Sequence, residues 1–168
     1  LVRGDIDAIT GFTFTSLLNL EARGVKAADV AVMPFADNGV KLYGNAIIAS
    51  AKLVRENPEA VRAFLKAFSK GAKEVMANPG AAIAYVKERD GIVNTALESR
   101  RLQLAIDTVI NTADARGEGF GQVSPTRMAL MASQISDVYA TKTRVNPETL
   151  WNGRFLPPVA DLDVFPKK

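Results

Sequence analysis

Any chemistry in this chain must come from carboxylates, amines, hydroxyls and phenols, because the sequence has no histidine and no cysteine. Histidine is the commonest general base and metal ligand, and cysteine supplies thiolates and disulfides. Carboxylate, lysine or tyrosine mechanisms are still open to the chain. No pair of carboxylates has a spacing that is typical of a catalytic pair. We therefore expect no enzyme activity, no cofactor and no metal site.

One glycine-rich segment has the composition of a phosphate-binding loop. Residues 117–121 read Gly-Glu-Gly-Phe-Gly, but they follow no predicted strand. They also lack the dinucleotide-binding and P-loop patterns. Asp114 and Arg116 come just before, at the end of a predicted helix, where a terminating glycine is expected. We interpret the segment as a connector between helices.

The composition is that of a globular protein without a nucleic-acid partner. The 168 residues suffice for one domain with a core, and 48% of them are hydrophobic. The net charge is only +3, and basic residues such as Lys66, Lys70 and Lys73 lie on the polar face of a predicted helix. Nucleic-acid binding would need a concentrated basic patch, and the sequence shows none.

Hydrophobic patterns predict an α/β chain with three strands and several helices. Short apolar or alternating runs predict strands at residues 4–9, 30–33 and 46–49. Helices are predicted at residues 14–23, 58–77, 79–88, 95–110, 125–139 and 147–151. Four of them begin with a capping residue followed by proline: Asn57-Pro58, Asn78-Pro79, Ser124-Pro125 and Asn146-Pro147.

The helix predicted at residues 58–77 has a continuous apolar stripe. Its members recur at helical spacing: Val61, Phe64, Leu65, Phe68, Ala72, Val75 and Met76. We expect this stripe to dock on the predicted sheet.

The amino-acid sequence of the segment from Tyr43 to Ala81 resembles that of a known protein family. A strand that ends in small residues, then Lys52-Leu53, then Asn57-Pro58-Glu59, leads into a helix with Phe, Ala and Gly. This order is similar to the C-terminal half of ABC-transporter substrate-binding proteins of the nitrate, sulfonate, taurine and thiamine-pyrimidine-precursor family. The family's Gly-x-x-Asp-Ala segment is matched by residues 4–8, and its closing Arg-Phe-Leu-Pro by residues 154–157.

The resemblance implies a type II periplasmic-binding-protein fold, in which two α/β lobes are joined by a hinge. Only the C-terminal part of that fold is expected here, with Leu1 as an internal residue of a longer protein. Residues 1–45 would form the end of the second lobe and a crossing strand. Residues 46–168 would return into the first lobe, mostly as helices with a C-terminal strap.

The same resemblance implies the ligand-binding residues. They lie in two segments that border the cleft in the family: Thr10, Gly11 and Phe12 in one, and Asp37, Asn38, Tyr43 and Asn45 in the other. A hydroxyl, a bare backbone and an aromatic face suit a small planar or anionic solute. The alternative is structural, with Thr10 and Gly11 as a turn, Phe12 as core and Asp37-Asn38-Gly39 as a turn.

The expected function is that of the solute-binding component of an ABC importer, which captures a small organic solute by hinge closure. Thiamine pyrimidine precursors, sulfonates such as taurine, and small aromatic carboxylates fit the family. The implied partners are the solute, a membrane permease and its ATPase, and a missing N-terminal lobe or a second copy. The implied location is the periplasm, or the cell surface as a lipoprotein. The alternatives are a pyrimidine synthase or desulfinase-like enzyme on the same fold, and a ligand-sensing regulatory domain.

Overall fold

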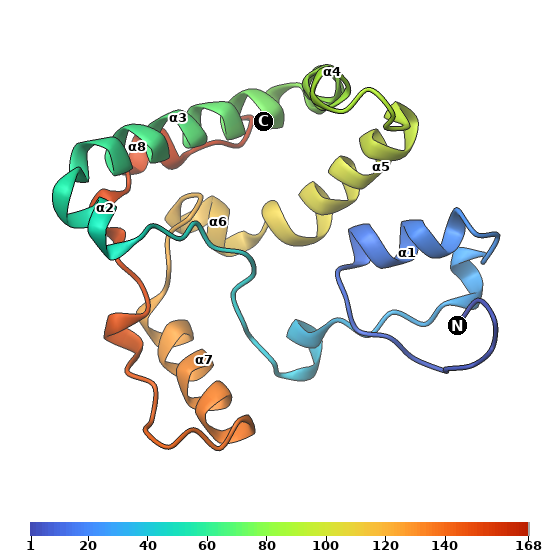
Figure 1. The fold of residues 1–168 in the computed structure, drawn as a ribbon, viewed down its shortest axis with the longest axis horizontal. Helices are drawn as coiled ribbons and strands as arrows, with labels where there is room; N and C mark the ends of the chain where they lie inside the picture. The colour runs from blue at the N-terminus through green and yellow to red at the C-terminus, as the bar shows by residue number, and fades with distance from the viewer. Residues whose placement is uncertain (168) are drawn as a thin grey trace. The chain divides into compact units, whose positions relative to one another are not determined.

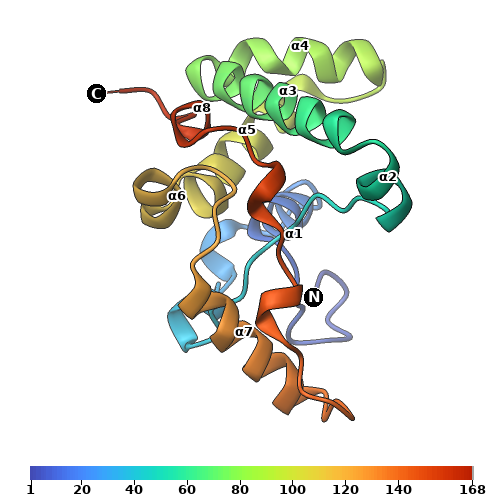
Figure 2. The ribbon, with the colours of Figure 1, turned by 90° about the vertical axis from the view of Figure 1, so that its left-hand side faces the viewer.

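A computed structural model describes residues 1–167 and shows helices joined by extended and irregular segments (Figures 1 and 2). The α-helices are α1 (Thr13–Glu21), α2 (Ala51–Glu56), α3 (Pro58–Ala77), α4 (Pro79–Arg89), α5 (Thr95–Ala105), α6 (Ala113–Glu118), α7 (Pro125–Val138) and α8 (Val159–Leu162). The 3-10 turns are η1 (Ala27–Asp29), η2 (Phe35–Asn38), η4 (Pro147–Thr149) and η5 (Gly153–Phe155), and a π-helical turn, η3 (Ile106–Ile110), continues α5. None of the helices within residues 1–167 has the length and hydrophobicity needed to cross a membrane.

The predicted α/β class and the type II periplasmic-binding-protein fold are wrong for this structure. Helices take up 59% of the chain, and residues 1–167 contain no strand. Figure 1 accordingly draws residues 4–9, 30–33 and 46–49 as coil. An apolar run favours an extended backbone, but a strand also needs a neighbour to pair its N–H and C=O groups. No described segment supplies that neighbour, and Ile48 is 91% exposed.

The helix starts that were predicted from a capping residue followed by proline are confirmed. The Asn57 side chain accepts a hydrogen bond from the Ala60 N–H at 3.3 Å. In the same way Asn78 caps α4, Ser124 caps α7 and Asn146 caps η4. The start of α3 and its end agree with the prediction, whereas the last predicted helix is shortened to the turn η4. A cap and the proline after it act within one turn, so the sequence suffices to predict them.

The chain divides into two compact units. Unit 1 contains residues 1–32 and 74–112 and the last residues from Phe165, and unit 2 contains residues 33–73 and 113–164. In unit 1, α1 and α4 both pack against α5. The Arg101 Nη1 donates to the Phe14 carbonyl at 2.9 Å, and Arg100 pairs with Glu21 at 2.6 Å, so α5 also holds α1 through polar contacts. The division at residue 45 that the family resemblance implied stays a prediction.

In unit 2 the core is built around Leu162. This side chain is fully buried, and its carbonyl accepts a hydrogen bond from the Phe120 N–H at 2.9 Å. Gly119 lies against it with a φ of 108°, and a Cβ at Gly119 would lie 3.1 Å from the Leu162 Cβ. The glycine-rich segment therefore connects α6 to α7, as predicted, and its glycine lets the chain pass close to α8.

The apolar stripe of α3 is only partly covered. Val61 and Met76 are buried, but Phe64 and Phe68 are exposed, although both were predicted to dock on a sheet. Their rings stack on each other, with centroids 6.3 Å apart, and Phe68 stacks at the same distance on Phe120. Without a sheet, the aromatic side chains of this stripe contact one another.

Replacing Leu162 with alanine should lower the free energy of unfolding by about 2–5 kcal/mol, because it leaves a cavity in a fully buried site. Leu150→Ala in the same unit is the matched control, since Leu150 is 45% exposed and should lose less than about 1 kcal/mol. Urea denaturation followed by circular dichroism measures both. Equal losses would contradict this description of the core.

Candidate functional site

The residues predicted to bind ligand fall in two places, one in each unit. One group precedes α1 in unit 1: Thr10, Gly11 and Phe12. The other group lies in unit 2, in η2 and in the extended segment that leads to α2: Asp37, Asn38, Tyr43 and Asn45.

The loop before α1 is shaped by Gly11 and Phe12. A Cβ at Gly11 would lie 2.4 Å from the Ser16 Oγ, so a larger residue here would require the Ser16 hydroxyl to rotate away. Phe12 is the N-cap residue, and its carbonyl accepts hydrogen bonds from the N–H groups of Thr15 and Ser16 at 3.0 and 2.8 Å. Its half-exposed ring stacks on Phe14, with centroids 5.1 Å apart. Phe12 therefore presents one aromatic face outward.

The start of α1 has no side-chain cap. The first N–H groups of a helix have no acceptor within the helix. Thr10 and Gly11 are exposed beside this end of α1, and the Thr10 hydroxyl makes no hydrogen bond to residues 1–167. The loop thus offers a hydroxyl, helix N–H groups and an aromatic face for a polar, flat molecule.

The turn at η2 is stabilised from within. The Asn38 Nδ2 donates to the Pro34 carbonyl at 2.9 Å, and the Asp37 N–H donates to the same carbonyl at 3.2 Å. Gly39 follows with a φ of 86°, which glycine adopts without strain. Asn38 therefore has the structural role that an Asp-Asn-Gly turn predicts. The exposed Asp37 carboxylate has no hydrogen bond within the described part of the chain.

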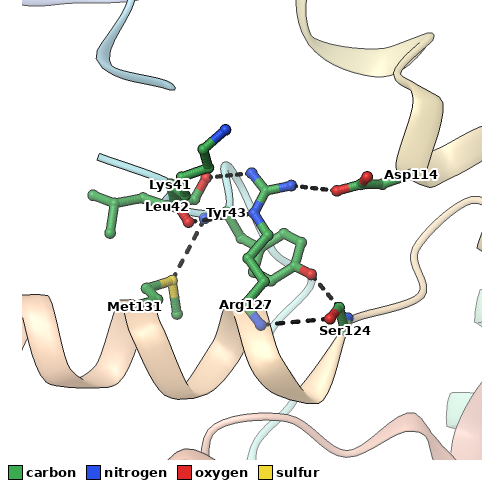
Figure 3. Close-up of polar contacts among 7 residues, drawn as sticks. All are labelled: Lys41, Leu42, Tyr43, Asp114, Ser124, Arg127 and Met131. Carbon is green, nitrogen blue, oxygen red and sulfur yellow. Dashed lines mark hydrogen bonds and ion pairs between the residues drawn. The ribbon is translucent and has the colours of Figure 1, made fainter. Parts of the chain in front are cut away.

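Tyr43 is held on helix α7 (Figure 3). Its hydroxyl accepts a hydrogen bond from the Ser124 N–H at 2.9 Å, and its own N–H donates to the Met131 Sδ at 3.5 Å. Ser124 is the N-cap residue of α7, so the phenol also satisfies an N–H group at the start of that helix. The half-buried Tyr43 hydroxyl therefore has a structural partner already.

Arg127 connects this tyrosine to the chain around it, as Figure 3 shows. Its guanidinium lies over the Tyr43 ring, with the carbon atom 4.3 Å from the ring centroid. It also donates to the Leu42 carbonyl at 2.8 Å, to the Lys41 carbonyl at 3.3 Å and to the Asp114 carboxylate at 2.7 Å. We call this set of contacts between Arg127 and residues 41–43 the arginine clamp. It fixes the extended segment on α7.

Sequence reasoning placed Met131 on the inward face of the helix predicted at residues 125–139, but it linked neither Met131 nor Arg127 to Tyr43. The Ser124-Pro125 signature predicts the start of α7, but nothing local links that start to Tyr43, which lies 81 residues earlier. Arg127 stands one turn into an amphipathic helix, where an arginine is an ordinary surface residue. The fold brings Tyr43, Ser124 and Arg127 together, and no pattern in the sequence predicts these contacts.

Three predicted ligand residues have side chains without internal hydrogen bonds. Thr10, Asp37 and Asn45 are exposed, and none of these side chains makes a hydrogen bond or ion pair to residues 1–167. Their polar groups are free to bind a solute. Among the same described residues there is no group of three acidic side chains that could hold a metal ion.

Tyr43→Phe should lower the free energy of unfolding by about 1 kcal/mol, because the Ser124 N–H loses its acceptor. Tyr85→Phe is the matched control, since the exposed Tyr85 hydroxyl makes no hydrogen bond to residues 1–167 and its loss should change little. Chemical denaturation of both variants tests this. If Tyr43→Phe were as stable as the parent, the hydroxyl would not anchor α7.

Comparison with known proteins gives one match, to a family. Residues 1–82 match the family model described as NMT1/THI5 like. The family resemblance inferred from the sequence is thus confirmed for this stretch, whereas its assignment to the C-terminal half of such proteins stays a prediction. No curated protein and no solved structure gives a significant match.

Proposed function

We propose that this chain, whose residues 1–82 match the NMT1/THI5-like family, captures a small organic solute for an importer. The family is one of nitrate-, sulfonate- and thiamine-precursor-binding proteins, so the match indicates a substrate-binding role. This match is the observation that carries the proposal. All seven residues predicted to bind ligand lie inside the matched stretch.

The structure refines the expected roles of these residues. Thr10, Asp37 and Asn45 carry polar groups that have no internal hydrogen bond, and Phe12 has an exposed ring face. We assign solute contact to the Thr10 hydroxyl and the Phe12 ring, which lie in unit 1, whereas Asp37 and Asn45 of unit 2 stay predicted ligand residues. Gly11 contributes by leaving the backbone at the start of α1 accessible. We assign the Tyr43 hydroxyl and Asn38 to positioning, because both have partners within the chain.

The chemistry of these residues suits capture of an intact solute. Within unit 1, the Thr10 hydroxyl and the N–H groups at the start of α1 can bind a sulfonate or a hydroxymethyl group, and the Phe12 ring can cover a heterocycle. A thiamine pyrimidine precursor and a small sulfonate are therefore the proposed solutes. Closure of two sheet-based lobes is no part of this proposal, because residues 1–167 form no sheet.

The proposed partners and location follow from the family. Its members are linked to ABC importers, so a membrane permease and an ATPase would receive the solute from this chain. We place the chain in the periplasm or, as a lipoprotein, at the cell surface. A secretory or lipoprotein signal in the complete gene would support this placement.

Isothermal titration calorimetry on the 168-residue chain tests solute capture. The panel holds 4-amino-5-hydroxymethyl-2-methylpyrimidine, its phosphate, taurine, an alkanesulfonate and nitrate. We expect saturable one-to-one binding of at least one member. Failure of the whole panel to bind at millimolar concentration would contradict the proposal, and conversion of a bound member to product would favour the enzyme alternative.

Thr10→Val should weaken binding of the captured solute about two- to tenfold, which is the loss of one hydrogen bond. Thr15→Val is the matched control, because Thr15 is exposed on α1 and is not among the residues predicted to bind. Both substitutions remove a hydroxyl and keep the branched shape of the side chain. Equal affinities of the two variants for the solute would remove Thr10 from the site.

A further inference from the structure

We propose that α3 docks on an anionic lipid membrane surface, with an exposed apolar side of the helix inserted among the headgroups and a line of basic side chains against the lipid phosphates. The relevant part of α3 is residues 58–73, which belong to unit 2. This stretch contains none of the seven residues predicted to bind ligand, so the proposal does not depend on solute capture.

One long side of α3 is apolar and open to solvent. Phe64 is 56% exposed and Phe68 is 47% exposed, whereas Val61 and Ser69 on another side of the helix are buried. Ala67 is exposed as well and is a surface neighbour of Phe64, because three residues separate them. We call this side the exposed face of α3, and it comprises Ala60, Ala63, Phe64, Ala67 and Phe68.

A line of basic residues runs along one edge of the exposed face. Its members are exposed and lie three or four residues apart, which keeps them on one side of the helix: Arg62, Lys66, Lys70 and Lys73. Lys70 is three residues from Ala67, so this line borders the exposed face directly. Residues 58–73 hold one acidic residue, Glu59, which pairs with Arg62 at 3.2 Å, and Glu74 comes next. The stretch therefore has a net positive charge.

These two features together fit a lipid surface. An amphipathic helix with phenylalanine on its apolar side and lysine or arginine on its polar side lies in the plane of a membrane interface. Insertion would remove the exposed ring surface of Phe64 and Phe68 from water. The long lysine side chains can reach the phosphates while the helix lies flat, because only their heads must stay in a polar environment. Charge complementarity then favours an anionic surface over a neutral one.

The aromatic rings are less suited to the other large polyanion, a single-stranded nucleic acid. Such binding uses free ring faces on which bases stack. The Phe68 ring already stacks on Phe64 and on Phe120, with centroids 6.3 Å away in each case. A lipid tail needs only apolar surface, so these ring contacts do not interfere with insertion.

Co-sedimentation of the purified full chain with lipid vesicles measures docking. Vesicles of equal parts phosphatidylglycerol and phosphatidylcholine should bind the chain in a saturable way, and added sodium chloride should weaken this binding. Pure phosphatidylcholine vesicles should bind at least about tenfold more weakly. Equal binding to both kinds of vesicle, or no binding to the anionic ones, would overturn the proposal.

A pair of lysine substitutions tests the basic line. Lys66→Gln combined with Lys73→Gln should weaken binding to the anionic vesicles about tenfold or more, because each lost charge weakens it about fivefold. Lys26→Gln combined with Lys142→Gln is the matched control, since both lysines are exposed, lie outside α3 and give the same net charge. This control should change binding less than about twofold. Equal effects of the two pairs would contradict docking through α3.

An aromatic substitution tests the exposed face. Phe64→Ser should weaken binding to the anionic vesicles at least about fivefold, because it removes the apolar surface that inserts. Tyr85→Ser is the matched control, since Tyr85 is 73% exposed on another helix, α4, and it should bind like the parent. Unchanged binding by Phe64→Ser would overturn the proposal. If circular dichroism shows that Phe64→Ser does not fold, the lysine pair still gives a decisive result.

Because the sequence has no cysteine, a single introduced cysteine can carry a fluorophore that responds to polarity. A label on Ala67→Cys, within the exposed face, should shift its emission to the blue on anionic vesicles. A label on Ala84→Cys, at an exposed position of α4, should not shift. Equal shifts at both positions, or none at Ala67→Cys, would contradict insertion of this face.

Two further outcomes separate this proposal from the others. Binding of labelled oligothymidine that is lost in Phe64→Ser, without any binding to vesicles, would overturn it in favour of a nucleic-acid site. Thr10→Val should bind vesicles like the parent, and Phe64→Ser should bind the captured solute like the parent. Loss of vesicle binding in Thr10→Val would contradict the independence of the two sites.

Discussion

Arg127 makes several of the contacts that hold the extended chain between η2 and α2 on α7, together with the contacts of Tyr43 with Ser124 and Met131. Its guanidinium donates to the carbonyls of Lys41 and Leu42, pairs with Asp114 and covers the ring of Tyr43. A planar group with several fixed donors can make these contacts together, whereas a lysine ammonium is a compact point charge. The segment has no sheet partner within residues 1–167, so the arginine clamp does part of what a neighbouring strand would do. It satisfies backbone carbonyls and fixes the course of the chain.

The clamp also explains how much of this structure could be predicted from its sequence. Asn57-Pro58 and Ser124-Pro125 specify helix starts because each signal acts within one turn, and both are confirmed. The predicted strand at residues 46–49 fails because pairing requires a distant partner that an apolar run does not reveal. The contacts of Tyr43 with α7 have the same origin, since 81 residues separate it from Ser124. The starts of the helices could therefore be predicted from the sequence, whereas contacts between residues far apart in the chain could not.

For the candidate site, too, the sequence predicted some features and the structure was needed for others. The absence of histidine and cysteine from the sequence limited the chemistry that could be expected, and the family resemblance implied binding. The structure adds which polar groups are free, and it separates Thr10 from Asn38 and Tyr43, whose side chains are already bonded. In unit 1, Phe12 stacks on Phe14 beside the loop, with ring centroids 5.1 Å apart.

The central claim is that this chain captures a small solute through the stretch that matches the NMT1/THI5-like family. Native mass spectrometry of the purified full chain, incubated with the solute panel, tests it most directly. The account predicts one additional mass that corresponds to a single intact solute and that decreases in Thr10→Val relative to Thr15→Val. A spectrum that shows only the bare chain at every solute concentration would contradict the account.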